Sequence, residues 1–449
     1  MNTSRRKQIL QLALPLILQQ LCLQMQLWID RAMLGHLNAA FFSAIGNASI
    51  PYHMITAAIT AVCGGTAILV AHSIGAKDPA RAQEVSEASF LGSTLLSCAA
   101  FVIFFFGSDS LFRIMGVQSP VLEYSVQYIR ILSVSLLVLG PAATATSILQ
   151  GLGLTKIIMI TGIAGNLLNI LLDWLLIFGK LGFPALGIRG AALATVLANI
   201  LSSALIVSYV LFHSRMPFRL RFRHILSGNF RCYRQVLTLG IPSGLEYALW
   251  NVGNVILVSF LNQLDMMSAG IYTLVFSVET VPMLIYMGFA NAGLTLVGQQ
   301  TGARSPRQAR QTGLLCLGFS LAVCIVIAAV FHTIPRPLLS LFTDDPEVLT
   351  ISVPYLVFVS WILFPKAVNN VIGLCIRGMG DTRWMLYTQI FGTAFMILCG
   401  YVLILRSPLG LSGIFVTLLW DESIRSVLNL FRFLFSNGEC DHHNRCAVP

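Results

Sequence analysis

Long apolar runs follow one another from near the start of the chain to residue 434. Each run is close to the roughly 20 residues that a helix needs to cross about 30 Å of hydrocarbon. Lipid satisfies no backbone hydrogen bonds, so such runs must form helices or a closed barrel, and they are too long and continuous for barrel strands. About twelve membrane spans are predicted, at residues 9–33, 44–73, 86–107, 124–150, 157–179, 187–213, 234–260, 269–300, 312–333, 347–375, 384–405 and 409–434.

The balance of charge supports this prediction. Only 10% of the residues are charged while 56% are hydrophobic, so the chain cannot supply a charged face to every helix of a soluble fold. The net charge of +10 does not indicate nucleic-acid binding, because the lysines and arginines gather in alternate loops. By the positive-inside rule these loops are cytoplasmic. We therefore expect a multi-pass protein of the plasma (inner) membrane with both termini in the cytoplasm.

The cysteines give no sign of a disulfide framework. Most of the ten are scattered singly through apolar runs, where a free thiol acts as a small hydrophobe. The tail contains Cys440, His442, His443 and Cys446, which are metal-ligand residue types, but their spacing matches no strong zinc motif. We expect no bound metal.

An internal repeat divides the chain into two copies of one unit. Pro15 matches Pro242 at an offset of 227, and residues 75–79 (GAKDP) match residues 302–306 (GARSP) at the same offset. Gly151, Gly153, Thr155 and Lys156 match Gly378, Gly380, Thr382 and Arg383, again at 227. Further on, Gly187 and Gly190 match Gly410 and Gly413 at 223, so the second copy has lost four residues. One register kept over separated motifs indicates duplication.

The duplication predicts an all-α fold of two six-helix bundles. Since each copy has an even number of spans, both enter the membrane in the same direction and are related by a pseudo-twofold axis along the membrane normal. The predicted divisions are an N-lobe (1–213), a basic linker (214–233), a C-lobe (234–434) and a cytoplasmic tail (435–449). We interpret the linker as a positive-inside anchor rather than as a ligand-binding segment.

Ionisable residues inside spans are costly and need a reason. Asp30 ends a polar stripe on the first span, formed with Gln19, Cys22 and Gln26 at spacings of three or four residues. The alternative is that Asp30 has reached the outer interface and pairs with Arg31. Asn166, Asn169 and Asp173 share one face of the fifth span. Burial disfavours a charged carboxylate, so Asp173 could exchange a proton near neutral pH. It could equally bind a hard cation or form a structural hydrogen-bond knot.

The C-lobe carries a second set of polar residues. Glu246 and Glu279 each lie within four residues of a proline and could form another proton or cation site. Alternatively, either glutamate pairs with Lys366, which lies close to Asn369. The last span holds Asp421, Glu422 and Arg425, which can neutralise one another on one helix, and we interpret them as structural.

Several catalytic signatures are missing. No GxxxxGK[ST] loop for a nucleotide-driven motor occurs, and neither does HExxH or GxSxG. The sequence therefore favours a transporter over an enzyme, with an ion gradient as the energy source.

The chain resembles the multidrug and toxic compound extrusion (MATE) family over nearly its whole length. No single motif is specific, but their order and spacing are. The motifs are Leu12-Ala13-Leu14-Pro15, Asp30 to Leu37 (DRAMLGHL), the turns at 75–79 and 302–306, Gln150 to Gly153 with Arg377 to Gly380, and Asn169 to Asp173 followed by Gly187 to Thr195. The Asn169/Asp173 pair together with Asp30 is most similar to the DinF-like branch.

This resemblance implies twelve helices around a central cleft and rocking between outward-open and inward-open states. It implies export of amphipathic, mostly cationic organic compounds in exchange for H⁺ or Na⁺, with no other cofactor. Asp30 and Asp173 would be coupling acids, Asn169 and Thr195 their polar neighbours, and Pro15 a hinge. Glu246 matches a C-lobe acid of other branches. The repeat places Met396 and Gly400 opposite Asn169 and Asp173, so the C-lobe lacks an equivalent site and protons are favoured.

Two rival functions stay open at this point. A lipid-linked precursor flippase of the same superfamily would need several basic groups in its cavity, and the spans hold only Arg130, Lys366 and Arg425. An integral membrane enzyme would need convergent catalytic residues in the spans. We expect a monomer in the bilayer, with small organic molecules and no nucleic acid as partners.

Overall fold

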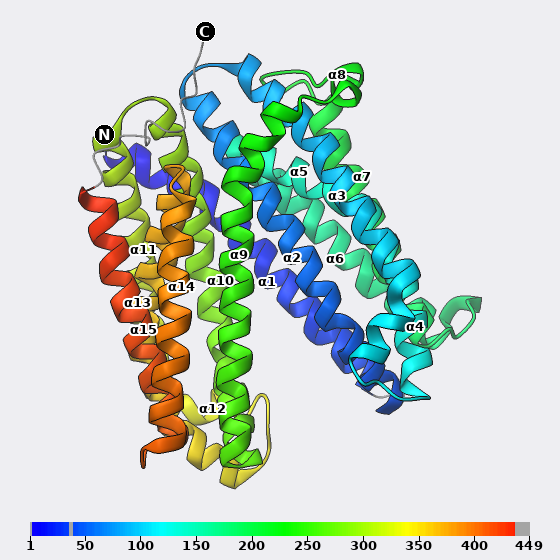
Figure 1. Cartoon of the computed structure of the whole chain (residues 1–449), viewed down its shortest axis with the longest axis vertical. Coiled ribbons are helices and arrows are strands. Elements are labelled where there is room, and N and C mark those ends of the chain that lie inside the picture. Colours follow the sequence, from blue (N-terminus) through cyan, green and yellow to red (C-terminus); the bar gives the residue numbers. More distant parts are fainter. Residues whose placement is uncertain (1, 36–38, 436–449) are drawn as a thin grey trace. The chain divides into compact units, whose positions relative to one another are not determined.

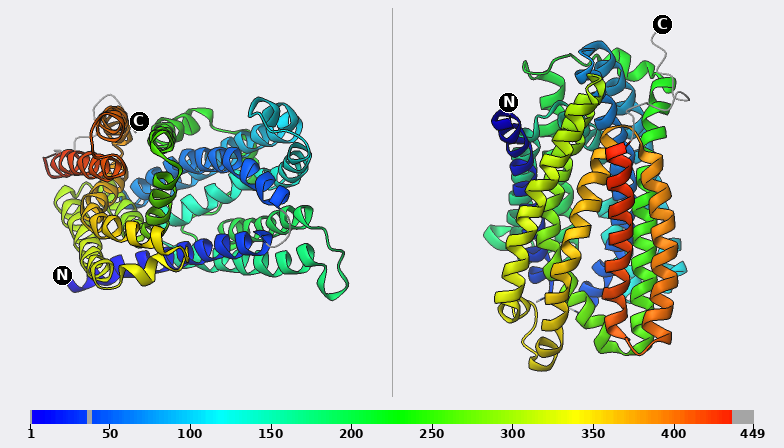
Figure 2. Two further views of the ribbon diagram at one scale, coloured as in Figure 1. Left: turned by 90° about the horizontal axis from the view of Figure 1, so that it is seen from below. Right: turned by 90° about the vertical axis from the view of Figure 1, so that its left-hand side faces the viewer.

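The computed structural model describes residues 2–35 and 39–435. Within these ranges it is built from helices, most of them long (Figures 1 and 2). A short helical turn at Lys180–Gly182 follows α6, and a π-helical stretch at Tyr401–Arg406 extends α14. The helices are α1 (Asn2–Gly35), α2 (Ala39–Gly75), α3 (Pro79–Ile114), α4 (Val121–Ser133), α5 (Leu136–Leu152), α6 (Thr155–Phe178), α7 (Ile188–Phe212), α8 (Phe222–Ser227), α9 (Phe230–Leu264), α10 (Met266–Gly302), α11 (Pro306–Thr333), α12 (Pro335–Leu339), α13 (Pro346–Gly378), α14 (Thr382–Gly400) and α15 (Leu411–Phe435).

In the described part of the chain, ten helices are long and apolar enough to cross a membrane. The predicted fourth span is a pair, α4 and α5, bent by 47° at its break, and counting this pair as one span makes eleven. The predicted twelfth span is α15, which forms as a helix of 25 residues. Asp421, Glu422 and Arg425 lower its hydropathy. They are nevertheless buried, because Arg425 forms an ion pair with each of the two acids.

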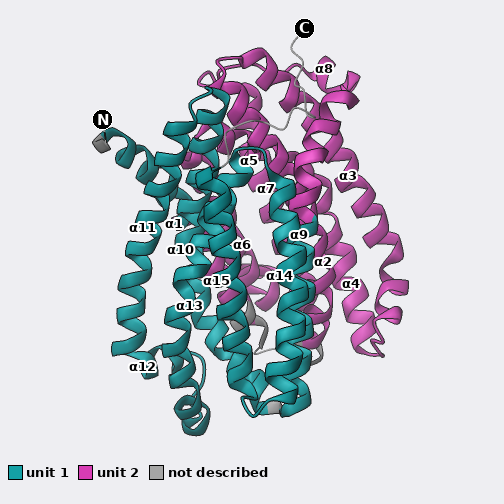
Figure 3. Cartoon of the chain, turned by 60° about the vertical axis from the view of Figure 1, so that its left-hand side comes forward, with its two compact units in different colours: residues 1–17, 245–449 teal, residues 18–244 magenta. Residues whose placement is uncertain are grey.

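The described chain forms two compact units (Figure 3). Unit 2 comprises Leu18–Gly244, and unit 1 comprises Met1–Ile17 with Leu245–Pro449. The boundaries therefore fall inside α1 and α9, two residues after Pro15 and two residues after Pro242. They are 227 residues apart, so the division follows the repeat. The lobe boundaries predicted from the sequence at the linker remain a prediction.

The backbone repeats as the sequence does. At the first turn of each copy, Lys77 and Arg304 have φ of 60° and 53°, in the left-handed region that non-glycine residues rarely adopt. The hydrogen bonds agree as well, since Asp78 N donates to Ser73 O and Ser305 N to Gln300 O, both at 2.9 Å. Such an unusual turn, formed twice at the same offset, confirms the duplication in three dimensions.

Each unit has its own apolar core. In unit 2 it includes Ile59, Phe112, Ile129 and Leu136, and in unit 1 it gathers around Leu257, Val275, Leu356 and Phe415. Every cysteine in the described residues is a free thiol, as predicted. The Cys440–Cys446 segment of the tail lies outside the described residues.

Candidate functional site

The polar site of unit 2 is built from α1, α6 and α7, and its centre is Gln26. The Gln26 amide donates to Asn169 Oδ1 and, at 3.3 Å, to Asp30 Oδ2. With its own amide oriented to satisfy its neighbours, Asn166 donates to Gln26 Oε1 at 2.9 Å. Asn169 Nδ2 in turn lies 3.5 Å from Thr195 Oγ1. One glutamine therefore connects the polar stripe of α1 to that of α6.

The two acids predicted in the N-lobe meet at this site. The carboxyl groups of Asp30 and Asp173 lie within hydrogen-bonding reach of each other. Asp173 and Asn169 are each only 2% exposed. Asp30 Oδ1 is buried and has no hydrogen-bond partner. The structure thus brings together all five residues predicted for the N-lobe site: Asp30, Asn166, Asn169, Asp173 and Thr195.

A bond between two carboxyl groups restricts their protonation. An ionised carboxylate has only acceptors, so the pair can be joined only when one member carries a proton. If both ionised, two negative charges would face each other in a buried setting, which is unfavourable unless a cation enters. The arrangement can therefore hold a proton or a small cation on oxygen ligands. Among the described residues, no group of three or more His, Cys, Asp or Glu side chains could hold a metal ion.

The alternative for Asp30 was pairing with Arg31 at the outer interface. The Arg31 side chain lies outside the described part of the structure. Asp30 is bound through Gln26 and Asp173, both in the same unit. Gln26 itself belonged to the predicted stripe but not to the predicted site. Its spacing of four residues from Asp30 was the signal for its role, because residues so spaced are neighbours on a helix.

A cavity of about 190 Å³ lies in unit 2. Its polar lining includes Gln19, Tyr52, Ser135 and Asn199, and it contains no charged side chain. Tyr52 and Ser135 share a hydrogen bond of 2.6 Å. The cavity can accept neutral or hydrogen-bonding groups, but it offers no countercharge to an ion.

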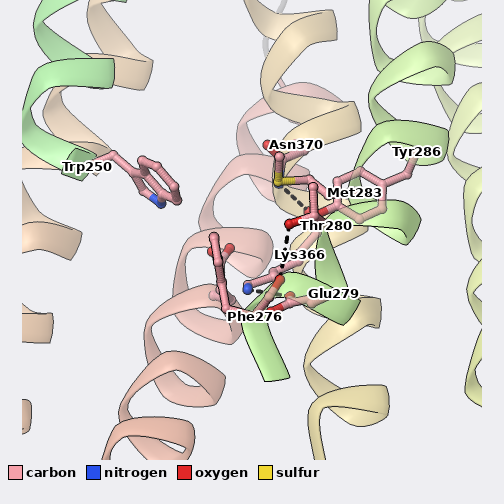
Figure 4. Close-up of a pocket in the computed structure, with 9 residues that line it drawn as sticks. Trp250, Phe276, Glu279, Thr280, Met283, Tyr286, Lys366 and Asn370 are labelled. Carbon is pink, nitrogen blue, oxygen red and sulfur yellow. Dashed lines mark hydrogen bonds and ion pairs between the residues drawn. The ribbon is translucent and has the colours of Figure 1, made fainter. Parts of the chain in front are cut away.

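The polar residues of unit 1 surround a smaller cavity of about 70 Å³ (Figure 4). Lys366 Nζ forms an ion pair with Glu279 Oε1 at 2.5 Å. Glu422 also lines the cavity, together with the aromatic side chains of Trp250, Phe276 and Tyr286. The site therefore combines one cation and two acids with apolar faces.

Behind this cavity, α13 and α15 share a buried network. Arg425 Nη2 lies 2.6 Å from Asp421 Oδ2 and 3.3 Å from Glu422 Oε1. Asn369 donates to Glu422 Oε2 at 2.8 Å and accepts from Asn429 at 2.7 Å. These contacts agree with the interpretation of Asp421, Glu422 and Arg425 as a self-neutralising group.

The remaining predicted residues lie elsewhere. Glu246 pairs with Arg377 at 2.5 Å, a partner that sequence reasoning missed, and it does not line the unit 1 cavity. The structure therefore separates Glu246 from Glu279 and Lys366. Pro15 is buried in α1, which remains helical on both sides of it. Its role as a hinge remains a prediction.

The cations inside the helices bear on the flippase alternative. Lys366 and Arg425 are each bound to acidic side chains, and Arg130 Nε donates to Ser108 at 3.1 Å. A pyrophosphate would have to displace these acids. The arrangement therefore does not favour a flippase.

Known proteins give the class to which this helical, duplicated chain belongs. The family model MatE matches residues 15–175 and again residues 242–402, two segments at the same offset of 227. The chain belongs to the MatE family of membrane transporters.

Relatives match it over nearly its full length. A protein of Thermotoga maritima named "Probable multidrug resistance protein NorM" is 27% identical, over 97% of this chain and 93% of the relative. A protein of the same name from Mannheimia succiniciproducens is 25% identical, over 95% and 93%. These names agree with a transporter of small molecules. The DinF-like branch stays a prediction.

Solved structures share the fold. One is titled as an outward-facing conformation of a multidrug resistance MATE family transporter of the MOP superfamily; it aligns with a TM-score of 0.90 at 20% identity, over 96% of each chain. A MOP superfamily transporter from Pyrococcus furiosus, whose title reports reverse polarity of its binding pocket, aligns equally well. The two-lobe helical fold expected from the repeat is confirmed.

Proposed function

We propose that the protein is a cation-coupled antiporter that exports amphipathic organic cations by alternating access, with H⁺ as the preferred coupling ion. The single observation that carries this proposal is the close approach of the carboxyl groups of Asp30 and Asp173, with Asp173 buried and Asp30 bound by Gln26. A buried acid pair inside spanning helices is costly, and such costly groups mark ion or proton pathways.

The amides around the pair have a defined task in this mechanism. Gln26 binds Asp30 and Asn169 through both hydrogens of its amide, so α1 and α6 are held together while the acids share a proton. Entry of a second proton would remove the remaining charge and change the hydrogen bonds between these helices. We propose that this change moves α1 about Pro15 and releases the substrate, and that proton loss on the cytoplasmic side restores the starting state.

The cavity of unit 1 supports the substrate class. Trp250, Phe276 and Tyr286 offer faces to an organic cation, and Met283 adds an adaptable apolar contact. Glu279 is paired with Lys366, while Asp421 and Glu422 share the single cation Arg425, so these five side chains carry an excess of one acid. We propose that aromatic cations bind through such contacts. We also propose that both termini of the transporter lie in the cytoplasm.

The test is efflux of ethidium from proteoliposomes. Asp173→Asn keeps the size of the side chain but cannot ionise, so we expect proton-driven efflux to fall at least about 100-fold, the effect expected when a group required for proton transfer is lost. Asp109→Asn removes an exposed acid that pairs with Arg113, and we expect it to retain efflux.

Two gradients distinguish the coupling ions. Efflux driven by a pH gradient without sodium supports protons, whereas efflux that requires a sodium gradient would replace protons by Na⁺ at the same oxygens. Full activity of Asp173→Asn under both gradients would overturn the proposed role of the acid pair.

A further inference from the structure

The connection between α7 and α9 is strongly basic. Residues 214–245 contain no aspartate or glutamate. Six arginines lie in this stretch, and all six side chains are exposed: Arg215, Arg219, Arg221, Arg223, Arg231 and Arg234. Within the part of the chain that the structure describes, no ion pair neutralises them. This charge is therefore available to a partner.

The first part of the connection is a strap, residues 213–221, whose side chains alternate. Met216, Phe218 and Leu220 are buried, whereas Arg219 and Arg221 are exposed. The apolar residues hold the strap on unit 2, and the arginines consequently face outward. A flexible loop would not need such an alternation of buried and exposed side chains. The strap is therefore an ordered segment that presents its arginines on the protein surface.

Helix α8 and the residues on either side of it are bound to two glutamates of α3. Arg221 N donates to Glu87 Oε1 at 2.9 Å, and His224 Nδ1 lies 3.5 Å from Glu87 Oε2. Asn229 donates to Glu84 Oε1 at 2.5 Å. These bonds use the backbone of Arg221 and leave its guanidinium free.

An apolar group of three side chains lies among the arginines. Phe222, Leu226 and Phe230 are 59%, 76% and 74% exposed. They are spaced by four residues, along α8 and at the first position of α9. Large apolar side chains so exposed are unfavourable in water and favourable at the boundary between headgroups and acyl chains.

The position of these residues in the chain places them at the boundary between headgroups and acyl chains. The strap follows the end of the candidate span at Phe212, and the candidate span of α9 starts at Phe230. Figure 1 shows α8 at the end of unit 2 where α7 ends and α9 begins. A segment between two adjacent spanning helices lies at the level of the lipid headgroups.

The sequence alone favoured a positive-inside anchor over a ligand-binding segment for this linker. From its exposed arginines and apolar side chains we propose instead that the strap, α8 and the first turn of α9 form a docking surface for anionic phospholipids of the adjoining leaflet. The arginines bind the phosphate and the anionic headgroup, and Phe222, Leu226 and Phe230 enter the acyl boundary. Each arginine near an anionic membrane surface strengthens binding about fivefold, and salt weakens the effect. This inference does not depend on antiport, because the surface lies outside the acid pair and both cavities.

The test uses the full-length protein in detergent, with bound lipid counted by native mass spectrometry. Phosphatidylglycerol is titrated against phosphatidylcholine, and glycerol phosphate serves as the free anion. We expect wild type to prefer phosphatidylglycerol. The triple variant Arg219→Gln, Arg221→Gln, Arg223→Gln should lose on the order of 100-fold in that affinity. The corresponding Arg→Lys triple variant should keep most of it.

A matched control removes the same charge from the other loops of unit 2, through Arg113→Gln, Lys180→Gln and Arg189→Gln. It should leave the preference unchanged. The variant Leu226→Ser with Phe230→Ser should weaken both lipids alike. The proposal is overturned if wild type has no preference, if the control loses as much as the linker variant, or if glycerol phosphate binds as tightly as the lipid. Because none of these readings uses transport, failure here is separate from failure of antiport.

Discussion

The two repeats place opposite chemistry at equivalent positions. In unit 2, Gln26 bonds to Asn169, and the carboxyl groups of Asp30 and Asp173 approach each other. An offset of 227 converts these pairs into Gly253 with Met396 and Leu257 with Gly400. Both apolar pairs are also in contact, Met396 with Gly253 and Leu257 with Gly400. The same helix crossing therefore carries a network of acids and amides in one unit and apolar packing in the other.

The cavities show the reverse difference. In the unit 2 cavity Tyr52, Leu139 and Asn199 are neutral. Their equivalents in unit 1, at offsets of 227 and 223, are Glu279, Lys366 and Glu422, which are charged. Each unit thus has one location with charged or ionisable side chains and one without them, in opposite order. The duplicated scaffold therefore determines which positions are in contact. Substitution after duplication determined which of these contacts carry charged side chains.

The largest expected effect concerns the charged network of unit 1. Arg425→Met leaves Asp421 and Glu422 buried without their cation, and removing one partner of a buried ion pair costs about 3–5 kcal/mol. The melting temperature of the purified protein should fall steeply. Adding Asp421→Asn and Glu422→Gln should recover most of the loss, because no unpaired charge is left. An unchanged melting temperature in the single variant would show that these charges are solvated.

In unit 2, Gln26→Leu tests the amide that joins α1 to α6. It leaves Asn169 and Asp30 without their donor, and an unsatisfied buried acceptor costs about 1–3 kcal/mol. The matched change in unit 1 is Gly253→Ala, where the added Cβ meets the flexible end of Met396 and, at 3.3 Å, the methyl group of Thr393. Denaturant unfolding should show the larger loss for Gln26→Leu. Equal losses would contradict the difference between the units.

The apolar crossing of unit 1 can be tested by overpacking. Gly400→Ala places a Cβ against Leu257, and crowding of this kind costs about 1–3 kcal/mol. The double variant with Leu257→Ala should cost less than the two single changes together, because it relieves the clash. Strict additivity in this mutant cycle would show that the two residues are not in contact.

The smallest effect is expected at Thr195→Val. The hydroxyl lies 3.5 Å from Asn169 Nδ2, at the limit of a hydrogen bond. A typical intramolecular hydrogen bond contributes about 0.5–1.5 kcal/mol, and this long one should lie at the low end. Leu418→Thr at the repeat-equivalent position should not affect the acid pair. A large loss of stability or efflux in Thr195→Val would instead give the hydroxyl a direct part in ion binding.

Much of the fold followed from the sequence. Span positions could be predicted because hydropathy is a local property, and each long apolar run must by itself form a helix in the bilayer. The N-lobe residues could also be predicted as a group, since helical spacing puts Asn166, Asn169 and Asp173 on one face. Gln26 was missed as their centre because its amide could have faced any neighbour of α1. Arg377 was missed as the partner of Glu246 because it lies 131 residues further along the chain.

The sequence by itself determined the helical membrane class, the duplication at an offset of 227 and the asymmetry between Asp173 and Gly400. These are properties of residue order, and lipid leaves a hydrophobic chain few alternatives to helices. Only the tertiary structure decided which charges meet. Glu279 and Glu246 were equivalent candidates for an ion pair with Lys366. In the folded protein Lys366 pairs with Glu279, and Glu246 pairs with Arg377. Ion pairing depends on distances of a few ångströms, and the order of residues along the chain does not contain those distances.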